Sequence, residues 1–171
     1  MEKNKLLSGL RRKKKAAQQD ASQAPQGPVI RVEPFTGTDY RMLSTLLNSF
    51  RSEVGQQPPT TEEWHRLRDA IEEDYIRYFI AYLDDAPVGL CSLCPYYSSI
   101  RSCPSAVFED FYVRPEARSQ GIARVLVKYA ADTVRSWGGR AMSVTCPPDD
   151  EAMYHALGFS DDLGFSKSMA L

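Results

Sequence analysis

The chain has 171 residues, of which 43% are hydrophobic and 25% charged, and its net charge at pH 7 is −1. This composition excludes a globally disordered protein, and the length favours one domain. No apolar run approaches the roughly 18 residues that a membrane-spanning helix requires, so we expect a cytoplasmic protein.

Charge is unevenly distributed along the chain. Residues 1–27 contain seven basic and two acidic residues, whereas residues 28–171 contain fourteen basic and twenty acidic residues. The first segment has no apolar periodicity, which predicts a solvated basic arm (1–27) before a single domain (28–171). The alternative is that the arm binds nucleic acid or an anionic membrane, because its basic run Arg11–Lys15 can neutralise phosphates. The acidic domain would suit a cationic small-molecule substrate.

Two helical patterns follow the first strand of the domain. A strand is predicted over residues 29–35, and the amphipathic helix after it has Thr38 or Asp39 as its cap. Residues 61–75 form a second helical pattern, for which Thr61 is the expected cap. Both patterns place one apolar stripe toward a core.

Two strand patterns joined by a turn come next, over residues 76–85 and 88–99, and we expect them to pair antiparallel. The second contains Cys91 and Cys94. Residues three apart on a strand point to opposite faces, so these thiols favour buried structural positions over a shared zinc, and no metal site is expected.

The pattern from residue 106 to 146 predicts a strand, a long helix from about 121 to 137, and another strand. Such a unit is a right-handed crossover, so its two strands should be parallel. A short helix within 147–159 and a closing strand over 164–171 complete the pattern. The fold class predicted is α/β, with a mixed, mostly antiparallel sheet that contains one parallel pair and carries helices on both faces.

The start of the long helix predicts an anion site. Four N–H groups lack partners at a helix N-terminus, and the helix dipole is positive there. Gly121 and Ala123 carry almost no side chain, so a ligand can approach the backbone closely, and Arg118 adds a positive charge. These features suit a phosphate or pyrophosphate. The alternative is that Gly121 has only a structural role, as the residue at which the helix begins.

The stretch "EDFYVRPEARSQGIARVLVKYAAD" (109–132), with "MYHALGF" (153–159), resembles the GCN5-related N-acetyltransferase (GNAT) superfamily. The family motif R/Q-x-x-G-x-G/A is met by Arg118, Gly121 and Ala123. The resemblance covers roughly residues 28–171 and implies the GNAT fold, with acetyl-CoA as co-substrate.

The resemblance also implies roles for individual residues. Backbone amides at the start of the helix would hold the pyrophosphate of acetyl-CoA. The preceding strand, splayed from its neighbour, would pair with the pantetheine amides. The implied cofactor-binding residues are Phe111, Tyr112, Val113, Arg118, Ser119, Gln120, Gly121, Ile122 and Ala123.

Transfer of an acetyl group from a thioester to an amine needs a deprotonated amine and a proton for the leaving thiolate. The resemblance implies Glu109 as the base and Tyr154 as the acid. Because Glu109 and Asp110 are neighbours on a strand, we expect them to face opposite sides. A salt-bridged structural Glu109 and a packed core Tyr154 are the alternatives, and His155 is expected at the surface.

These residues favour an N-acetyltransferase that moves an acetyl group from acetyl-CoA to a primary amine of a small molecule or peptide, by direct attack in a ternary complex. One alternative is a non-catalytic acyl-CoA-binding regulatory module. Another is an enzyme that uses the basic arm to act on a protein or nucleic-acid-associated partner. A homodimer also remains open. The loops expected to shape the acceptor pocket are 55–61 and 94–105.

Overall fold

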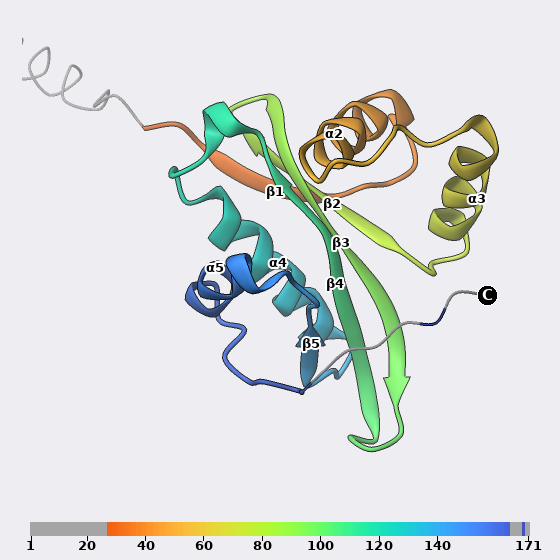
Figure 1. The fold of residues 1–171 in the computed structure, drawn as a ribbon, viewed down its shortest axis with the longest axis vertical. Coiled ribbons are helices and arrows are strands. Elements are labelled where there is room, and N and C mark those ends of the chain that lie inside the picture. Colours follow the sequence, from red (N-terminus) through yellow and green to blue (C-terminus); the bar gives the residue numbers. More distant parts are fainter. Residues whose placement is uncertain (1–26, 165–168, 170–171) are drawn as a thin grey trace, which may run out of the picture.

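A five-stranded sheet with helices on both faces forms the fold in the computed structural model, which describes residues 27–164 and 169 (Figure 1). In chain order the elements are β1 (Ile30–Pro34), α2 (Tyr40–Glu53), α3 (Thr61–Glu72), β2 (Arg77–Leu83), β3 (Ala86–Ser98), β4 (Cys103–Val113), η1 (Pro115–Ala117), α4 (Ile122–Ser136), β5 (Ala141–Ser143), η2 (Pro148–Asp150) and α5 (Glu151–Ala156), where η marks a 3-10 helix. The predicted α/β class with a mixed sheet is confirmed. None of the described helices is long and apolar enough to span a membrane.

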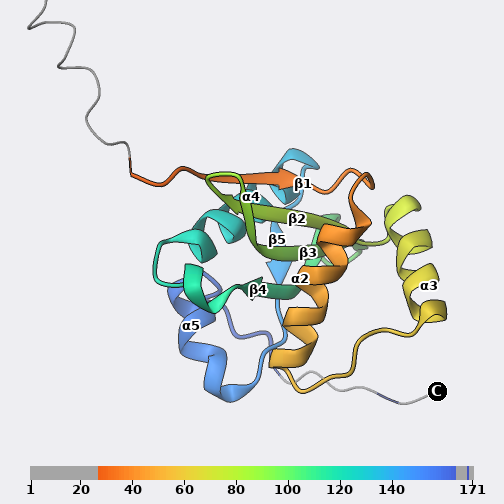
Figure 2. The same ribbon diagram turned by 90° about the horizontal axis from the view of Figure 1, so that it is seen from above.

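The strands lie in the order β1–β2–β3–β4–β5, and each neighbouring pair is antiparallel except β4 and β5. β4 and β5 are parallel because α4 connects them as a crossover, as the sequence predicts. Helices α2 and α3 cover one face of the sheet, and α4 and α5 cover the other (Figure 2). Each face has its own buried cluster, with Phe108 and Leu126 on the α4 side and Leu46 and Tyr78 on the α2 side.

The two helices on the α2 side begin at side-chain caps. The Asp39 side chain accepts a hydrogen bond from the Met42 amide at 2.9 Å, as expected for the first helix. The cap expected at Thr61 is wrong by one residue. Thr60 caps α3 instead, because its extended backbone lets its hydroxyl accept from the Glu63 amide at 3.2 Å while the Glu63 carboxylate accepts from the Thr60 amide at 2.7 Å.

Helix α4 matches its predicted bounds closely. Gly121 is its N-cap and Trp137 its C-cap, and Gly138 continues the chain in the left-handed conformation that often ends a helix (φ 81°). The apolar stripe of α4 packs against the sheet; its buried members are Ile122, Leu126, Val127, Ala130 and Val134.

The hairpin of β3 and β4 is longer than expected. Cross-strand pairing continues to Ser98 and Cys103, so the loop expected over 94–105 is wrong and only residues 99–102 form the turn. The strand expected over 88–99 is confirmed to Ser98, and Pro95 and Pro104 both lie within the paired strands. Within the same hairpin, Cys91 is buried on the α4 side and Cys94 packs against the α2 side, which confirms their opposite faces.

Two expected features lie almost entirely outside the described residues: the basic arm over 1–27 and the closing strand over 164–171. The strand expected over 141–146 is shorter in the structure. β5 ends at Ser143 because its pairing with β4 ends there.

Candidate active site

β4 separates from β5 part-way along its length. The two strands pair only from Ser105 with Ala141 to Val107 with Ser143. Beyond that point, Phe108–Val113 line a cleft of about 1060 Å³ whose other walls come from α4, α5 and the segment after β5. An unpaired strand edge offers N–H and C=O groups to a ligand.

Most of the residues expected to bind the cofactor line this cleft. They are Phe111, Tyr112, Val113, Arg118, Ser119, Gly121, Ile122 and Ala123. Gln120 does not line it; its side-chain amide donates instead to the Glu116 carbonyl at 3.3 Å. The segment from η1 into α4 therefore presents backbone and small side chains to the cleft.

The loop before α4 has two residues in the left-handed conformation. Ser119 has a φ of 61° and Gly121 a φ of 87°. A Cβ added to Gly121 would meet no atom within 4 Å, so the space in front of this backbone is open. An anionic group can therefore reach the helix N-terminus, which fits the pyrophosphate expected there.

The Arg118 side chain is bound by other groups of the chain. Its Nε donates to the Val113 carbonyl at 2.9 Å, and its Nη2 contacts both carboxylate oxygens of Glu53, at 2.7 and 2.5 Å. Glu53 is the last residue of α2, so the ion pair ties that helix to the loop before α4. An anion at the start of α4 would therefore rely on backbone amides and the helix dipole more than on a free Arg118 cation.

A β-bulge in β4 changes the direction of the two adjacent carboxylates. Leu90 pairs with Tyr112 and Ser92 with Glu109, so three steps along β4 oppose two steps along β3. The extra residue interrupts the alternation of side chains. The expectation that Glu109 and Asp110 face opposite sides is therefore wrong.

Hydrogen bonds show that both carboxylates lie on the α2 side of the sheet. The Cys94 thiol donates to Glu109 at 3.5 Å, and the Ser92 hydroxyl donates to Asp110 at 3.2 Å. Ser92 and Cys94 are two residues apart on β3 and share that face. The Tyr78 hydroxyl from β2 also donates to Asp110, at 2.5 Å.

The donors to these carboxylates keep their protons at neutral pH. Burial raises the pKa of the Tyr78 phenol well above its usual value, and the neighbouring Asp110 charge adds to the effect. Burial and then the Glu109 charge raise the pKa of the Cys94 thiol to about 12. Both groups stabilise an adjacent carboxylate by donating to it.

Tyr154 lines the cleft from α5, on the opposite side of the β4 edge from the α2 helix. Its ring packs against Phe111 (centroids 6.0 Å apart) and Phe159 (5.7 Å). Burial, followed by the charge of Asp150, raises the pKa of Tyr154 to about 12, so its hydroxyl is protonated at neutral pH. His155 is exposed, as expected.

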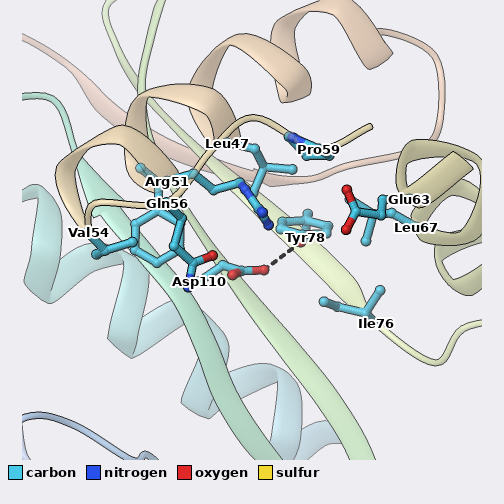
Figure 3. Close-up of a pocket in the computed structure, with 11 residues that line it drawn as sticks. Leu47, Arg51, Val54, Gln56, Pro59, Glu63, Leu67, Ile76, Tyr78 and Asp110 are labelled. Atoms are coloured by element: carbon cyan, nitrogen blue, oxygen red, sulfur yellow. Dashed lines mark hydrogen bonds between the residues drawn. The ribbon is translucent and has the colours of Figure 1, made fainter. Parts of the chain in front are cut away.

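A second cavity, of about 430 Å³, opens between α2, α3, β2 and β4 (Figure 3). Phe50, Val54 and Asp110 line both this cavity and the larger cleft, so the two spaces adjoin at the bulge. The expected loop 55–61 contributes Gln56 and Pro59, whereas no residue of 94–105 lines either space.

Comparison with known proteins identifies the fold. Residues 40–159 match the model of the acetyltransferase (GNAT) family. The chain belongs to the GNAT family. Membership classes this GNAT protein with the acyltransferases, and members of the family use acetyl-CoA.

Individual relatives of the GNAT protein agree with this assignment. Thialysine N-epsilon-acetyltransferase of Caenorhabditis elegans is 36% identical over 73 residues, which is 43% of this chain and 45% of that protein. The matched stretch thus spans less than half of the relative. A crystal structure of a probable acetyltransferase has 25% identity and a TM-score of 0.73 over 82% of this chain and 97% of the other. A "predicted acetyltransferase with acetyl-CoA" from Clostridium acetobutylicum shares the fold, with 11% identity and a TM-score of 0.68 over 82% and 96% of the chains.

Sequence reasoning missed several residues that the fold of the GNAT protein brings to the site. Tyr78 contacts Asp110 across 32 positions of the chain, and Glu53 contacts Arg118 across 65. Arg51 lines the second cavity, but in the sequence it is one more charged residue on an amphipathic helix. Only Asp110 had a local signal, its place beside Glu109.

Proposed function

We propose that this GNAT protein is an acetyl-CoA-dependent N-acetyltransferase that acetylates a primary amine of a small molecule or peptide in a ternary complex. The observation that carries the proposal is the junction at the β4 bulge. There the cleft along the open strand edge adjoins a second cavity; Asp110 lines both spaces, and Glu109 lines the cleft beside it.

The residues of the cleft fit acetyl-CoA in two ways. The unpaired edge Phe108–Val113 offers hydrogen bonds to amides of an extended ligand. The open backbone at Gly121 offers an anion site at a helix N-terminus. When bound, acetyl-CoA supplies the acetyl thioester. An amine acceptor is supported by the name of the C. elegans relative, thialysine N-epsilon-acetyltransferase.

In the proposed chemistry, the acceptor nitrogen forms a bond to the acetyl carbonyl carbon and the carbon–sulfur bond breaks. The products are an N-acetyl amide and a thiol. Glu109 takes the proton that the acceptor nitrogen loses, because its exposed carboxylate lies on the α2 side of β4 and lines the cofactor cleft next to Asp110. Tyr154, on the other side of the β4 edge, gives a proton to the sulfur.

The experiment that tests this function is release of free thiol from acetyl-CoA by the full-length protein. The acceptors should include amines, amino acids, aminoglycosides and peptides. Acceptor-dependent thiol release, with the acetyl group found on nitrogen by mass spectrometry, is the expected result. Binding of acetyl-CoA without turnover on any acceptor would instead indicate a binding module.

A further inference from the structure

We propose that the acceptor carries a carboxylate in addition to its reacting amine, and that Arg51 in the second cavity binds that carboxylate. The inference rests on the proposed function and deepens it by naming the acceptor class, an amino acid with a side-chain amine. It comes from the charges of the cavity and not from the cofactor cleft.

Arg51 is positioned to receive an anion. It lies in the last turn of α2 and is half-buried, and Figure 3 shows its side chain pointing into the cavity toward Tyr78. Its Nε donates to the Gln57 carbonyl at 2.7 Å, which fixes the plane of the guanidinium. Four further N–H donors sit on its two terminal nitrogens, and a guanidinium matches a carboxylate in a bidentate geometry.

The charge of Arg51 is not used in an ion pair within the part of the chain that the structure describes. Glu63 also lines the cavity; the hydrogen bond from the Thr60 amide, in the cap of α3, is the main cause that lowers the pKa of its carboxyl, and the charge of Arg51 adds to this effect without a direct ion pair. Much of the remaining lining is apolar: Leu47, Phe50, Val54, Pro59, Leu67 and Ile76. Because no carboxylate among the described residues forms a direct ion pair with Arg51, its terminal N–H groups can bind the carboxylate of a ligand.

The opposite charge lies where the cavity meets the cofactor cleft. Asp110 lines both spaces, and the hydrogen bonds from Tyr78 and Ser92 both go to its Oδ2. Its second oxygen remains to attract an ammonium group. A ligand with a carboxylate at Arg51 and an amine near Asp110 would therefore satisfy both ends of the cavity, with its carbon chain against the apolar wall. A plain diamine would place a cation beside Arg51 and be disfavoured.

The test compares acceptors that differ only in the carboxylate: lysine, ornithine and diaminobutyrate, each against its carboxamide. We expect wild type to acetylate at least one free acid with a higher kcat/KM than its carboxamide. Arg51→Met should lower kcat/KM for that acid by roughly ten- to a hundredfold and leave its carboxamide within about threefold, because a charge-assisted hydrogen bond is lost for the acid alone. Arg51→Lys should recover part of the preference. Arg41→Met is the matched control, since Arg41 is exposed on the same helix and lines neither cavity.

The ratio of the two kcat/KM values is the deciding quantity. A general disturbance of the loop held by Arg51 would lower both acceptors together and overturn the inference, as would equal use of acids and carboxamides by wild type. Calorimetric binding of the same pairs to the protein saturated with CoA separates this result from failure of the proposed function. Arg51-dependent binding of the acid without any turnover would support the carboxylate site and contradict the enzymatic activity.

Discussion

The Tyr78 hydroxyl donates a 2.5 Å hydrogen bond to Asp110 and so ties β2 to the bulge of β4. Tyr78 is almost fully buried, and Asp110 is half-buried beside it. The buried Tyr78 phenol finds its hydrogen-bond partner in Asp110, and Asp110 accepts from both Tyr78 and Ser92. The position of the two bulge carboxylates therefore depends on a tyrosine two strands away.

Removal of that hydroxyl should destabilise the fold. For Tyr78→Phe we expect a loss of about 1.5–3 kcal/mol in the free energy of unfolding, because a hydrogen bond to a charged carboxylate is lost while Ser92 remains as the other donor to Asp110. Urea denaturation followed by circular dichroism measures the change. Tyr75→Phe is the matched control, since Tyr75 is 68% exposed and should change stability by less than about 0.5 kcal/mol. Equal midpoints for wild type and Tyr78→Phe would contradict the role given to this bond.

Glu109→Gln should lower turnover while preserving shape. If Glu109 accepts the proton of the acceptor amine, the rate at neutral pH falls by roughly 10²–10⁴. Raising the pH should partly restore the rate, because solvent then deprotonates the amine. Glu62→Gln, on the exposed face of α3, is the control and should behave as wild type. Near-wild-type turnover of Glu109→Gln on a good acceptor would assign the proton to water or to Asp110.

Tyr154→Phe should affect turnover and not acetyl-CoA affinity, because the hydroxyl acts after binding. The pKa of Tyr154 is raised to about 12, so the phenol stays protonated below that pH. We therefore expect no loss of wild-type rate from ionisation of Tyr154 between pH 7 and about 10. Steady-state kinetics and calorimetry measure the two quantities. Tyr96→Phe, on the hairpin outside both cavities, is the control, and a large loss of affinity in Tyr154→Phe would indicate a packing role instead.

Two substitutions of Gly121 should separate backbone strain from charge. Both alanine and glutamate would hold a side chain at a φ of 87°, which costs roughly 1–2 kcal/mol in either case. Only the glutamate places a negative charge in the open space before α4. We expect Gly121→Glu to bind acetyl-CoA far more weakly than Gly121→Ala at equal thermal stability. Equal affinities in calorimetry would show that the pyrophosphate does not lie there.

Local sequence patterns predicted the parts of the fold that local chemistry determines. The run from Phe108 to Trp137 contains its own strand period, breaker and helical stripe, so the crossover and the cap at Gly121 could be read directly. The bulge could not, because one extra residue in β4 depends on the register with β3 and leaves no mark in the alternation around Glu109. The prediction of Thr61 as the cap was wrong for a smaller reason: Thr60 and Thr61 follow one another and offer the same hydroxyl at adjacent positions.

Long-range contacts limited prediction of the candidate site in a different way. The charge of Arg118 was visible in the sequence, but its partner Glu53 lies on a helix whose position depends on the whole sheet. The same holds for Arg51, which becomes distinctive only because α2 and α3 enclose a cavity around it. Local motifs thus allowed candidate residues such as Glu109 and Tyr154 to be named, whereas the residues that surround them depend on the fold.

The last turn of α2 is a shared wall. Phe50 and Val54 border both the cofactor cleft and the second cavity, and Glu53 between them holds the loop before α4 through Arg118. A ligand that shifts this turn from one side changes the space on the other side. Thermodynamic linkage then requires reciprocity: the factor by which bound CoA alters the affinity for an acceptor equals the factor by which the acceptor alters the affinity for CoA.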